Sequence, residues 1–263
     1  MIDSVARFTG FAAEYDRARP RPPAELTRLL CAWAASPAPR VVDLGAGTGL
    51  STAIWSGVAA SVIALEPSPD MRALAERRLT TLPDAGSFTV LDALAEDTGL
   101  PAGAADLVVA SQAMHWFDPA RVLPEIARLL RPGGVFAAVD CDWPPVVRAE
   151  ADAAYVEFER GLLTQDDTGG RRPAYADKEG HLGRLAASGL FGYTREICLH
   201  SVDSGDADRL VAVARSQGGT VAALAAGITE EALGLTALRE TADRLLPEPV
   251  PWWWTYRVRL AVK

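Results

Sequence analysis

A glycine-rich turn that follows a short apolar strand constrains this chain more than any other feature. The strand Arg40-Val-Val-Asp-Leu44 leads directly into Gly45-Ala-Gly-Thr-Gly49. Three glycines in five residues allow a tight turn and a close ligand, because no Cβ intervenes. The short helix expected behind the turn offers free N–H groups to that ligand. A strand, turn and helix in this order are typical of α/β folds with a parallel sheet.

The same alternation of apolar strands and helical patterns continues along the chain. We expect strands at residues 40–44, 61–65, 87–91, 106–111, 135–139, 194–202 and 253–262. The first five strands alternate with helical stripes, which predicts a doubly wound, Rossmann-like α/β sheet. The complete prediction is a seven-stranded sheet whose last strand is antiparallel, with a helical cap inserted late in the chain. The cap would close over the carboxyl ends of the strands, where ligands bind in such sheets.

Composition excludes several classes of function. The net charge of −8 argues against a nucleic-acid partner, since phosphate binding needs a dense basic surface. No apolar run reaches the roughly 18 residues that span a bilayer, and the N-terminus does not resemble a signal peptide. The cysteines fit neither a disulfide framework nor a zinc site. We therefore expect no membrane partner, no metal, and buried free thiols at Cys31, Cys141 and Cys198 in a reducing cytoplasm.

Two acidic residues follow the next strands at positions suited to a nucleoside-containing cofactor. Glu66 ends the second strand, where a carboxylate can accept hydrogen bonds from both ribose hydroxyls. Asp92 ends the third strand and could accept one from an adenine amino group. The dinucleotide fingerprint G-x-G-x-x-G requires a third glycine at position 50, but this chain has Gly49 and Leu50.

These residues resemble the motifs of class I S-adenosylmethionine-dependent methyltransferases. Residues 41–49 are similar to the first motif of that family, and Glu66, Asp92-Ala93, Ser111-Gln112 and the segment 129–134 match later motifs in order. The resemblance covers about residues 40–140. It implies S-adenosyl-L-methionine as cofactor and S-adenosyl-L-homocysteine as product.

Two further segments are similar to the type 11 small-molecule group, which includes trans-aconitate methyltransferase-like proteins. They are residues 11–23 and Ser111-Gln-Ala-Met-His-Trp-Phe-Asp118. By resemblance, Gln112, His115 and Trp116 would face the methyl group or the acceptor as catalytic residues. The cofactor contacts implied in the same way are Tyr15, Arg19, Asp43, Gly45, Ala46, Gly47, Gly49, Glu66, Pro67, Met71, Asp92, Ala93, Ser111 and Gln112.

The predicted function is methyl transfer to oxygen or carbon of a small molecule, a carboxylate included, plausibly in bacterial secondary metabolism. His115 has the ordinary pKa of a general base, which a hydroxyl or carbon acceptor requires and a carboxylate does not. Two alternatives stay open: an NAD(P)-dependent oxidoreductase and a non-catalytic protein that binds S-adenosylmethionine. The predicted domains are a lid segment and helix at 1–39, the cofactor-binding core at 40–143, a helical cap at 144–190, and the rest of the core at 191–263 with a helical insertion at 206–246.

Overall fold

The computed structural model describes residue 16 and residues 18–166 and 177–263. Their contacts divide the chain into two compact units. The sheet unit comprises Arg21–Cys141, Pro173–Leu199 and Tyr256–Lys263, and the helical unit comprises Met1–Pro20, Asp142–Arg172 and His200–Thr255. The predicted domain boundaries are a different division and stay a prediction.

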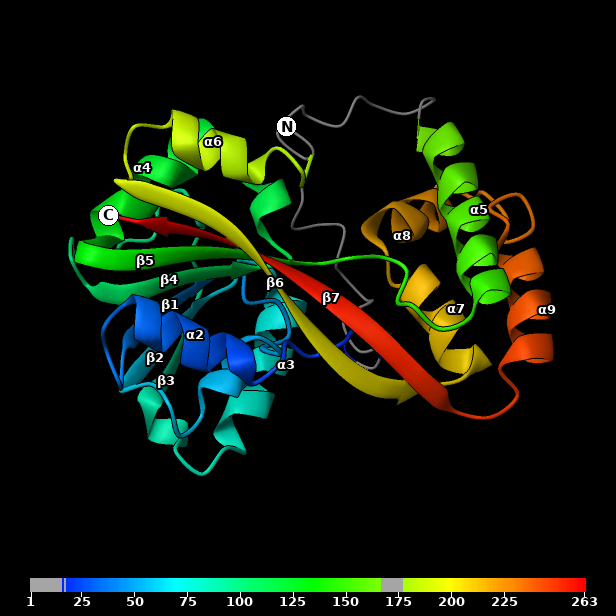
Figure 1. Ribbon diagram of the computed structural model, residues 1–263, viewed down its shortest axis with the longest axis horizontal. Helices are drawn as coiled ribbons and strands as arrows, with labels where there is room; N and C mark the ends of the chain where they lie inside the picture. The colour runs from blue at the N-terminus through cyan, green and yellow to red at the C-terminus, as the bar shows by residue number, and fades with distance from the viewer. Residues whose placement is uncertain (1–15, 17, 167–176) are drawn as a thin grey trace. The chain divides into compact units, whose positions relative to one another are not determined.

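Seven strands form one sheet in the order β3-β2-β1-β4-β5-β7-β6 (Figure 1). The strands β1 to β5 are parallel to one another, and β7 is antiparallel to β5. The predicted Rossmann-like class and the antiparallel last strand are thus confirmed. The strands are β1 Arg40–Leu44, β2 Ser61–Leu65, β3 Phe88–Leu91, β4 Ala105–Ser111, β5 Leu130–Cys141, β6 Tyr193–Gly205 and β7 Val250–Val262.

The strand order reverses between β1 and β4. From β1 the chain adds β2 and β3 on one side, then returns to place β4 and β5 on the other. Parallel registers bring the carboxyl ends of these strands to one edge, with Leu44 beside Leu65 and Ser111 beside Val139. In doubly wound sheets this reversal point is where ligands bind.

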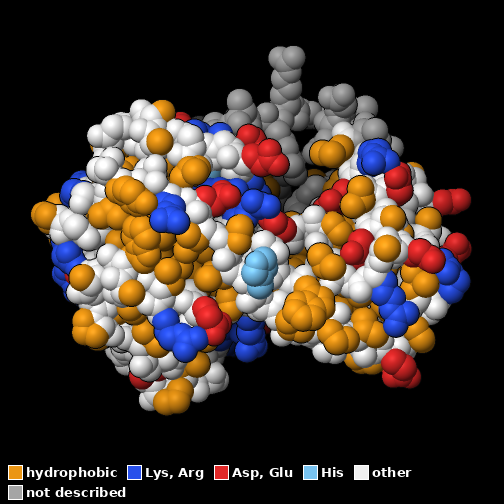
Figure 2. Space-filling view, in the orientation of Figure 1, with side chains coloured by type: hydrophobic (Ala, Val, Ile, Leu, Met, Phe, Trp, Pro, Cys, Tyr) orange, Lys and Arg blue, Asp and Glu red, His pale blue; other side chains and the backbone are white. Residues whose placement is uncertain are grey.

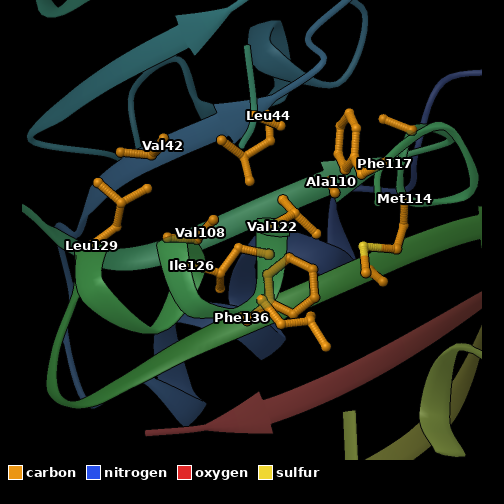
Figure 3. Packing of buried hydrophobic residues seen from close by; sticks show 14 of the residues in the cluster. Val42, Leu44, Val108, Ala110, Met114, Phe117, Val122, Ile126, Leu129 and Phe136 are labelled. Carbon is orange, nitrogen blue, oxygen red and sulfur yellow. The ribbon is translucent and has the colours of Figure 1, made fainter. Parts of the chain in front are cut away.

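An apolar cluster fixes helix α4 against one face of the sheet (Figure 3). Pro119 begins α4, and the side chain of Asp118 caps it by accepting a hydrogen bond from the Ala120 N–H at 2.9 Å. Val122 and Ile126 of α4 are fully buried with Phe136 of β5. Burying a side chain of this size contributes about 1.5–3 kcal/mol. The cluster therefore holds rigidly the segment that joins β4 to α4.

Other helices of the sheet unit belong to the same α/β alternation. Helix α3 begins at Pro69 and buries Met71, Ala75 and Leu79, as its apolar spacing predicts. Leu185 of α6 lies in the same apolar cluster as α4. The elements are α2 Glu25–Trp33, η2 Thr52–Trp55, α3 Pro69–Thr80, η3 Ala85–Ser87, η4 Met114–Trp116, α4 Pro119–Leu129 and α6 His181–Ala187.

The helical unit packs α5 against α8 and α9, and α7 against α8 and α9. Tyr155 and Phe158 of α5 and Leu238 of α9 are almost fully buried there. Three of these helices, α7, α8 and α9, lie in the stretch 206–246, where the sequence predicts a helical insertion. The helices are α5 Ala149–Asp166, α7 Ala207–Arg215, α8 Gly218–Ala225 and α9 Leu235–Leu245.

The later strands are longer than their apolar runs. β5 already begins at Leu130, where it pairs with Ala105 of β4 across a register shift, so the Pro-Gly-Gly segment lies inside the strand. β7 begins at Val250 and alternates its tryptophans: Trp252 and Trp254 are buried, whereas Trp253 is exposed. The alternation indicates that Trp252 and Trp254 pack in the core.

The surface of the protein corrects one expectation from the sequence. In the described part of the chain, no helix combines the length and the apolarity needed to cross a bilayer. The three cysteines are free, but only Cys141 is buried, whereas all three were expected to be. Cys31 is half-buried, and Cys198 lies on the edge strand β6 with its side chain exposed. The face drawn in Figure 2 intersperses acidic and basic side chains with apolar ones.

Candidate functional site: the carboxyl ends of β1, β2, β4 and β5

The glycine loop, residues Gly45–Gly49, joins β1 to the 3-10 helix η2. Gly45, Gly47 and Gly49 have φ angles of +65°, +59° and +78°, in the left-handed region that favours glycine. A Cβ on Gly45 would lie 2.9 Å from the Ala113 Cβ, and one on Gly49 would lie 3.2 Å from the Ala75 Cα. A Cβ on Gly47 would meet no atom within 4 Å. The outer glycines are thus required by packing, whereas Gly47 leaves its backbone open to a ligand.

Asp43 lies fully buried at the end of β1, beneath this loop. Its Oδ2 accepts hydrogen bonds from Ser51 Oγ at 3.0 Å and Thr52 Oγ1 at 2.7 Å. Its Oδ1 accepts none within the described residues. Burial raises the pKa of Asp43 to about 6. The site therefore holds a buried acceptor that a donor group on a ligand would satisfy.

Glu66, at the end of β2, is bonded to the loop itself. Its Oε2 accepts from the Gly47 N–H and its Oε1 from the Ser68 N–H, both at 2.8 Å. Burial raises the pKa of Glu66, while these two backbone donors act in the opposite direction. A carboxylate has about four acceptor positions, so both oxygens can still accept from ribose hydroxyls. Glu66 thus stabilises the glycine loop through these hydrogen bonds and is also a candidate ribose ligand.

Asp92 ends β3 in a more exposed position. Its Oδ2 lies 3.0 Å from Arg72 Nη2, and Arg72 also donates to the backbone oxygens of Glu66 and Pro67. The arginine ties the ends of β2 and β3 together. The other predicted cofactor residues nearby differ in burial: Ala46 and Met71 are buried, and Pro67, Ala93 and Ser111 are half-buried.

The segment after β4 carries the predicted catalytic residues and begins with a strained residue. Gln112 has a φ of +55°, which is uncommon for a residue with a side chain. Its N–H donates to Val139 O at 2.7 Å, which extends the pairing of β4 with β5 by one residue. Strain of this kind persists only where the surrounding structure enforces it and is frequent at functional sites.

His115 and Trp116 follow on the 3-10 helix η4. Their ring centroids are 4.8 Å apart, and Trp116 packs against the apolar cluster beneath α4. Met114, the first residue of η4, is almost fully buried. Gln112, His115 and Trp116 are thus brought together at the carboxyl end of β4, as the sequence predicts, whereas their catalytic roles stay a prediction.

Sequence reasoning missed a group of charged residues around Asp140, the penultimate residue of β5. We name as the Asp140 cluster the residues Gln112, His115, Asp140, Lys178, His181 and Arg259. Asp140 Oδ2 accepts from Arg259 Nη1 at 2.7 Å and lies 3.8 Å from His181 Nε2. Asp140 Oδ1 lies 3.4 Å from Lys178 Nζ and 4.0 Å from His115 Nδ1. The sequence predicted Gln112 and His115 as site residues, but it did not place Asp140, Lys178 or Arg259 beside them.

Three members of the cluster also have the composition of a metal site. The potential ligand atoms of His115, Asp140 and His181 lie within 4.8 Å of one another. Lys178 and Arg259 already neutralise that carboxylate, and their charges would repel a divalent cation. Because a guanidinium can only donate, the 2.7 Å contact from Arg184 Nη2 makes His181 Nδ1 an acceptor and puts the proton on Nε2. These contacts disfavour a metal, and its expected absence stays a prediction.

Burial lowers the pKa of His181 to about 4. The Asp140 carboxylate opposes this shift, whereas the cations of Arg184, Arg259 and Lys178 act in the same direction as burial. His181 is therefore neutral at physiological pH. In that state it is a buried donor directed at Asp140, not a third positive charge in the cluster.

The structure describes one of the two N-terminal residues predicted to contact the cofactor. Tyr15 lies outside the described residues. Arg19 belongs to the helical unit, where its Nε and Nη2 donate to Ser216 Oγ and Ser216 O at 3.0 and 2.8 Å. Its guanidinium also lies 4.7 Å from the centroid of the Trp143 ring. A role for Arg19 toward the cofactor stays a prediction.

Comparison with known families agrees with this geometry. The family model described as "Methyltransferase domain" matches residues 42–138, from β1 into β5. This match spans less than half of the chain, and within it residues 42–138 are similar to the methyltransferase-domain family. The resemblance found in the sequence is thus confirmed for the segment that carries the glycine loop, Glu66 and the residues after β4.

Relatives of the methyltransferase domain include an uncharacterized methyltransferase of Mycobacterium tuberculosis. It is 41% identical over 133 residues, which are 50% of this chain and 51% of the relative. The match thus spans about half the length of that curated relative.

Two solved structures extend the likeness to nearly the whole chain. A type II methyltransferase of Anaeromyxobacter dehalogenans is 26% identical with a TM-score of 0.68, covering 93% of this chain and 97% of the other. An S-adenosylmethionine-dependent methyltransferase of Geobacter sulfurreducens, solved with S-adenosyl-L-homocysteine, shares the fold at 19% identity and a TM-score of 0.53, with all of both chains covered. S-adenosyl-L-homocysteine is the ligand of the second structure, which shares the fold with this chain.

Proposed function

We propose that this protein is an S-adenosylmethionine-dependent methyltransferase that acts on a small-molecule acceptor in the bacterial cytoplasm. The observation that carries the proposal is the contact between Glu66 Oε2 and the Gly47 N–H at 2.8 Å. It joins the open glycine of the loop to the acid at the end of the neighbouring strand. A loop with a ligand-accessible backbone and a ribose acceptor beside it suits an adenosine-containing cofactor.

The residues of the sheet unit fit the parts of this cofactor. Glu66 would accept from the ribose hydroxyls, Asp92 would accept from the adenine amino group, and Asp43 lies beneath the loop with a buried acceptor oxygen. S-adenosylmethionine supplies an activated methyl group when bound. The protein's task is then to hold the acceptor in line, exclude water, and remove a proton where the acceptor carries one.

Gln112, His115 and Trp116 are proposed to form the acceptor side of the site. Trp116 and the buried Met114 would supply an apolar surface, which favours a step in which the positive charge of a sulfonium is dispersed. Fold alone does not assign a substrate, so the acceptor is defined here by chemistry. A place in secondary metabolism is part of the proposal.

Calorimetry with S-adenosyl-L-homocysteine and with NADH tests the class of cofactor. We expect the purified protein to bind S-adenosyl-L-homocysteine and not NADH. The reverse result would replace the methyltransferase by the oxidoreductase alternative.

Incubation with methyl-labelled S-adenosylmethionine and a bacterial metabolite extract tests for catalysis. We expect a labelled small molecule by mass spectrometry. Tight binding of S-adenosyl-L-homocysteine with no labelled product would favour the non-catalytic alternative.

A further inference from the structure

The Asp140 carboxylate connects two sets of side chains through its two oxygens. The Oδ2 atom is held from β7 by Arg259 at 2.7 Å, and the carboxylate is only 4% exposed. Arg259 Nε is in turn 2.8 Å from Glu196 Oε2 on β6. The chain Glu196–Arg259–Asp140 therefore fixes the carboxylate across three strands. The Oδ1 atom is left to face Lys178 and His115.

His115 is the member of this cluster whose position suits a general base. Its Nδ1 faces the fixed Oδ1 atom at 4.0 Å, which is about 1 Å longer than a hydrogen bond. The negative charge at Oδ1 favours a proton on Nδ1 and leaves the lone pair on Nε2. Catalytic contacts of this kind are commonly long in ligand-free structures and shorten in the substrate complex.

Lys178 links this pair to the residue that would bind the acceptor. Its Nζ lies 3.4 Å from Asp140 Oδ1 and donates to Gln112 Oε1 at 2.9 Å. Because an ammonium only donates, it must face the amide oxygen and thereby sets the orientation of the Gln112 amide. The amide Nε2 is buried and has no partner within the described residues. The Asp140 cluster thus holds an amide donor of fixed orientation.

We propose that Asp140 is a positioning residue that makes His115 the general base of the reaction. The acceptor is a neutral molecule with a hydroxyl group, and the Gln112 amide donates a hydrogen bond to the oxygen of that hydroxyl. This inference rests on the proposed methyltransferase function and names its class of acceptor. His115 would be the catalytic residue, and Asp140, Arg259 and Lys178 would act through it or through Gln112.

The charges of the cluster favour a neutral acceptor over a carboxylate. Among the described residues, the cations Lys178 and Arg259 are already paired with the anions Asp140 and Glu196. An incoming carboxylate would add an unpaired charge next to Asp140, and burying an unpaired charge is costly. A carboxylate is also nucleophilic without a base, so the arrangement around His115 would serve no purpose for it.

The proposed step is balanced within the site. The hydroxyl proton passes to His115 Nε2, and an oxygen lone pair forms the new bond to the methyl carbon. The electron pair of the broken carbon–sulfur bond stays on sulfur, so the positive charge of the sulfonium is replaced by that of the imidazolium. Asp140 then lies beside a cation, and the proton returns to solvent as the product leaves.

The first test is the tautomer of His115, measured by nitrogen-15 NMR without any acceptor. The chain has only three histidines, His115, His181 and His200, so their ring nitrogens can be assigned by substitution. In the wild-type protein, when the imidazole rings are uncharged, we expect the proton of His115 on Nδ1 and that of His181 on Nε2. Asp140→Asn should abolish the preference at His115 and leave His200 unchanged. A proton on Nε2 of His115 in the wild type would overturn the proposal even if the variant fails to fold.

The second test is the chemistry of the labelled product. Mild alkali releases labelled methanol from a methyl ester, whereas a methyl ether is stable. We expect a stable label, and an alkali-labile label would overturn the hydroxyl assignment while leaving the methyltransferase function intact. The absence of both S-adenosyl-L-homocysteine binding and any product would instead refute the proposed function.

Lys178→Met tests the link to Gln112, and Lys263→Met is its matched control because Lys263 is the other lysine of the chain. Lys263 donates to Leu130 O at the opposite end of β5. We expect product formation from the extract to fall about tenfold in Lys178→Met, which corresponds to roughly 1.4 kcal/mol of free energy. It should be unchanged in Lys263→Met. Equal rates in the two variants would remove Lys178 from the site.

Discussion

The carboxyl ends of β1 and β2 differ from those of β4 and β5 in how their residues come together. At β1 and β2, the glycine loop and Glu66 are 17 to 21 residues apart in the chain and are bonded directly to each other. At β4 and β5, the Asp140 cluster gathers residues from position 112 to position 259. The first region relies on backbone geometry and local spacing, and the second on charges carried by distant elements.

This difference indicates which residues of the sheet unit select the cofactor and which act on the acceptor. Gly47 and Glu66 present backbone and carboxylate groups that suit one kind of cofactor. Asp140 is shared by His115, Lys178 and Arg259, so altering any of these partners alters the others. We therefore expect substitutions in the first region to change cofactor affinity, and those in the second to change turnover.

The sharpest test of this division is His115→Ala. If His115 is the base, turnover should fall by about 10²–10⁴-fold, the usual contribution of general acid–base catalysis. Affinity for S-adenosyl-L-homocysteine in calorimetry should be nearly unchanged. The control is His200→Ala, since His200 lies in the helical unit beside Thr255 and should leave both quantities unaltered. Unchanged turnover in His115→Ala would remove the imidazole from the mechanism.

The next largest effect is expected for Glu66→Gln, which keeps the shape of the side chain but removes its charge. Hydrogen bonds to charged groups contribute about 1.5–3 kcal/mol. Affinity for S-adenosyl-L-homocysteine should therefore fall by about 10- to 100-fold. Glu76→Gln is the control, because Glu76 is exposed on α3. Equal affinities in the two variants would contradict a ribose-binding role for Glu66.

Gly47→Ala separates backbone strain from ligand approach. An alanine in the left-handed region costs about 1–2 kcal/mol. Gly57 has a φ of +71° and, like Gly47, no atom within 4 Å of an added Cβ, so Gly57→Ala carries the same strain outside the loop. We expect both variants to lose similar thermal stability. Only Gly47→Ala should lose affinity for S-adenosyl-L-homocysteine, by roughly tenfold, and parallel losses in both variants would show that no ligand lies against Gly47.

The smallest effect concerns pH and the second region alone. Burial lowers the pKa of His181 from 6.5 to about 4, so folding disfavours its protonated form. The stability gained from neutral His181 is present above pH 6.5 and is lost as the pH falls toward 4. His181→Gln should lack this loss. As the pH falls over this range, the melting temperature of the variant should therefore decline less than that of the wild type. The difference should be roughly 2–4 °C for each kcal/mol of unfolding free energy that the wild type loses. Identical declines would place His181 in a more solvated site.

Much of the fold followed from local patterns that the chain repeats. The apolar strands and the stripes of α3 and α4 predicted the parallel half of the sheet, because period and capping are properties of short segments. The early start of β5 at Leu130 was not predicted, since Pro132, Gly133 and Gly134 are typical of a turn. Leu130 pairs with Ala105 of β4, and Gly133 and Gly134 form backbone hydrogen bonds with Lys263, which follows β7. These contacts hold the segment in the strand.

The strain at Gln112 was likewise invisible in the sequence. A glutamine has no preference for a positive φ, so only its hydrogen bond to Val139 O across the sheet explains the conformation. The same pairing places Gln112 near Asp140, the residue that follows Val139. Two candidate site residues thus owe their proximity to strand register.

The sequence by itself determined the class of sheet, the glycine loop and the acids that follow β2 and β3, because each of these depends on residues close together in the chain. Only the tertiary structure decided that His115 faces Asp140, that Arg259 of β7 holds that carboxylate, and that Lys178 reaches Gln112. These contacts join β4, β5, β7 and the segment before α6. Electrostatic interactions act through space, and no spacing along the chain encodes them.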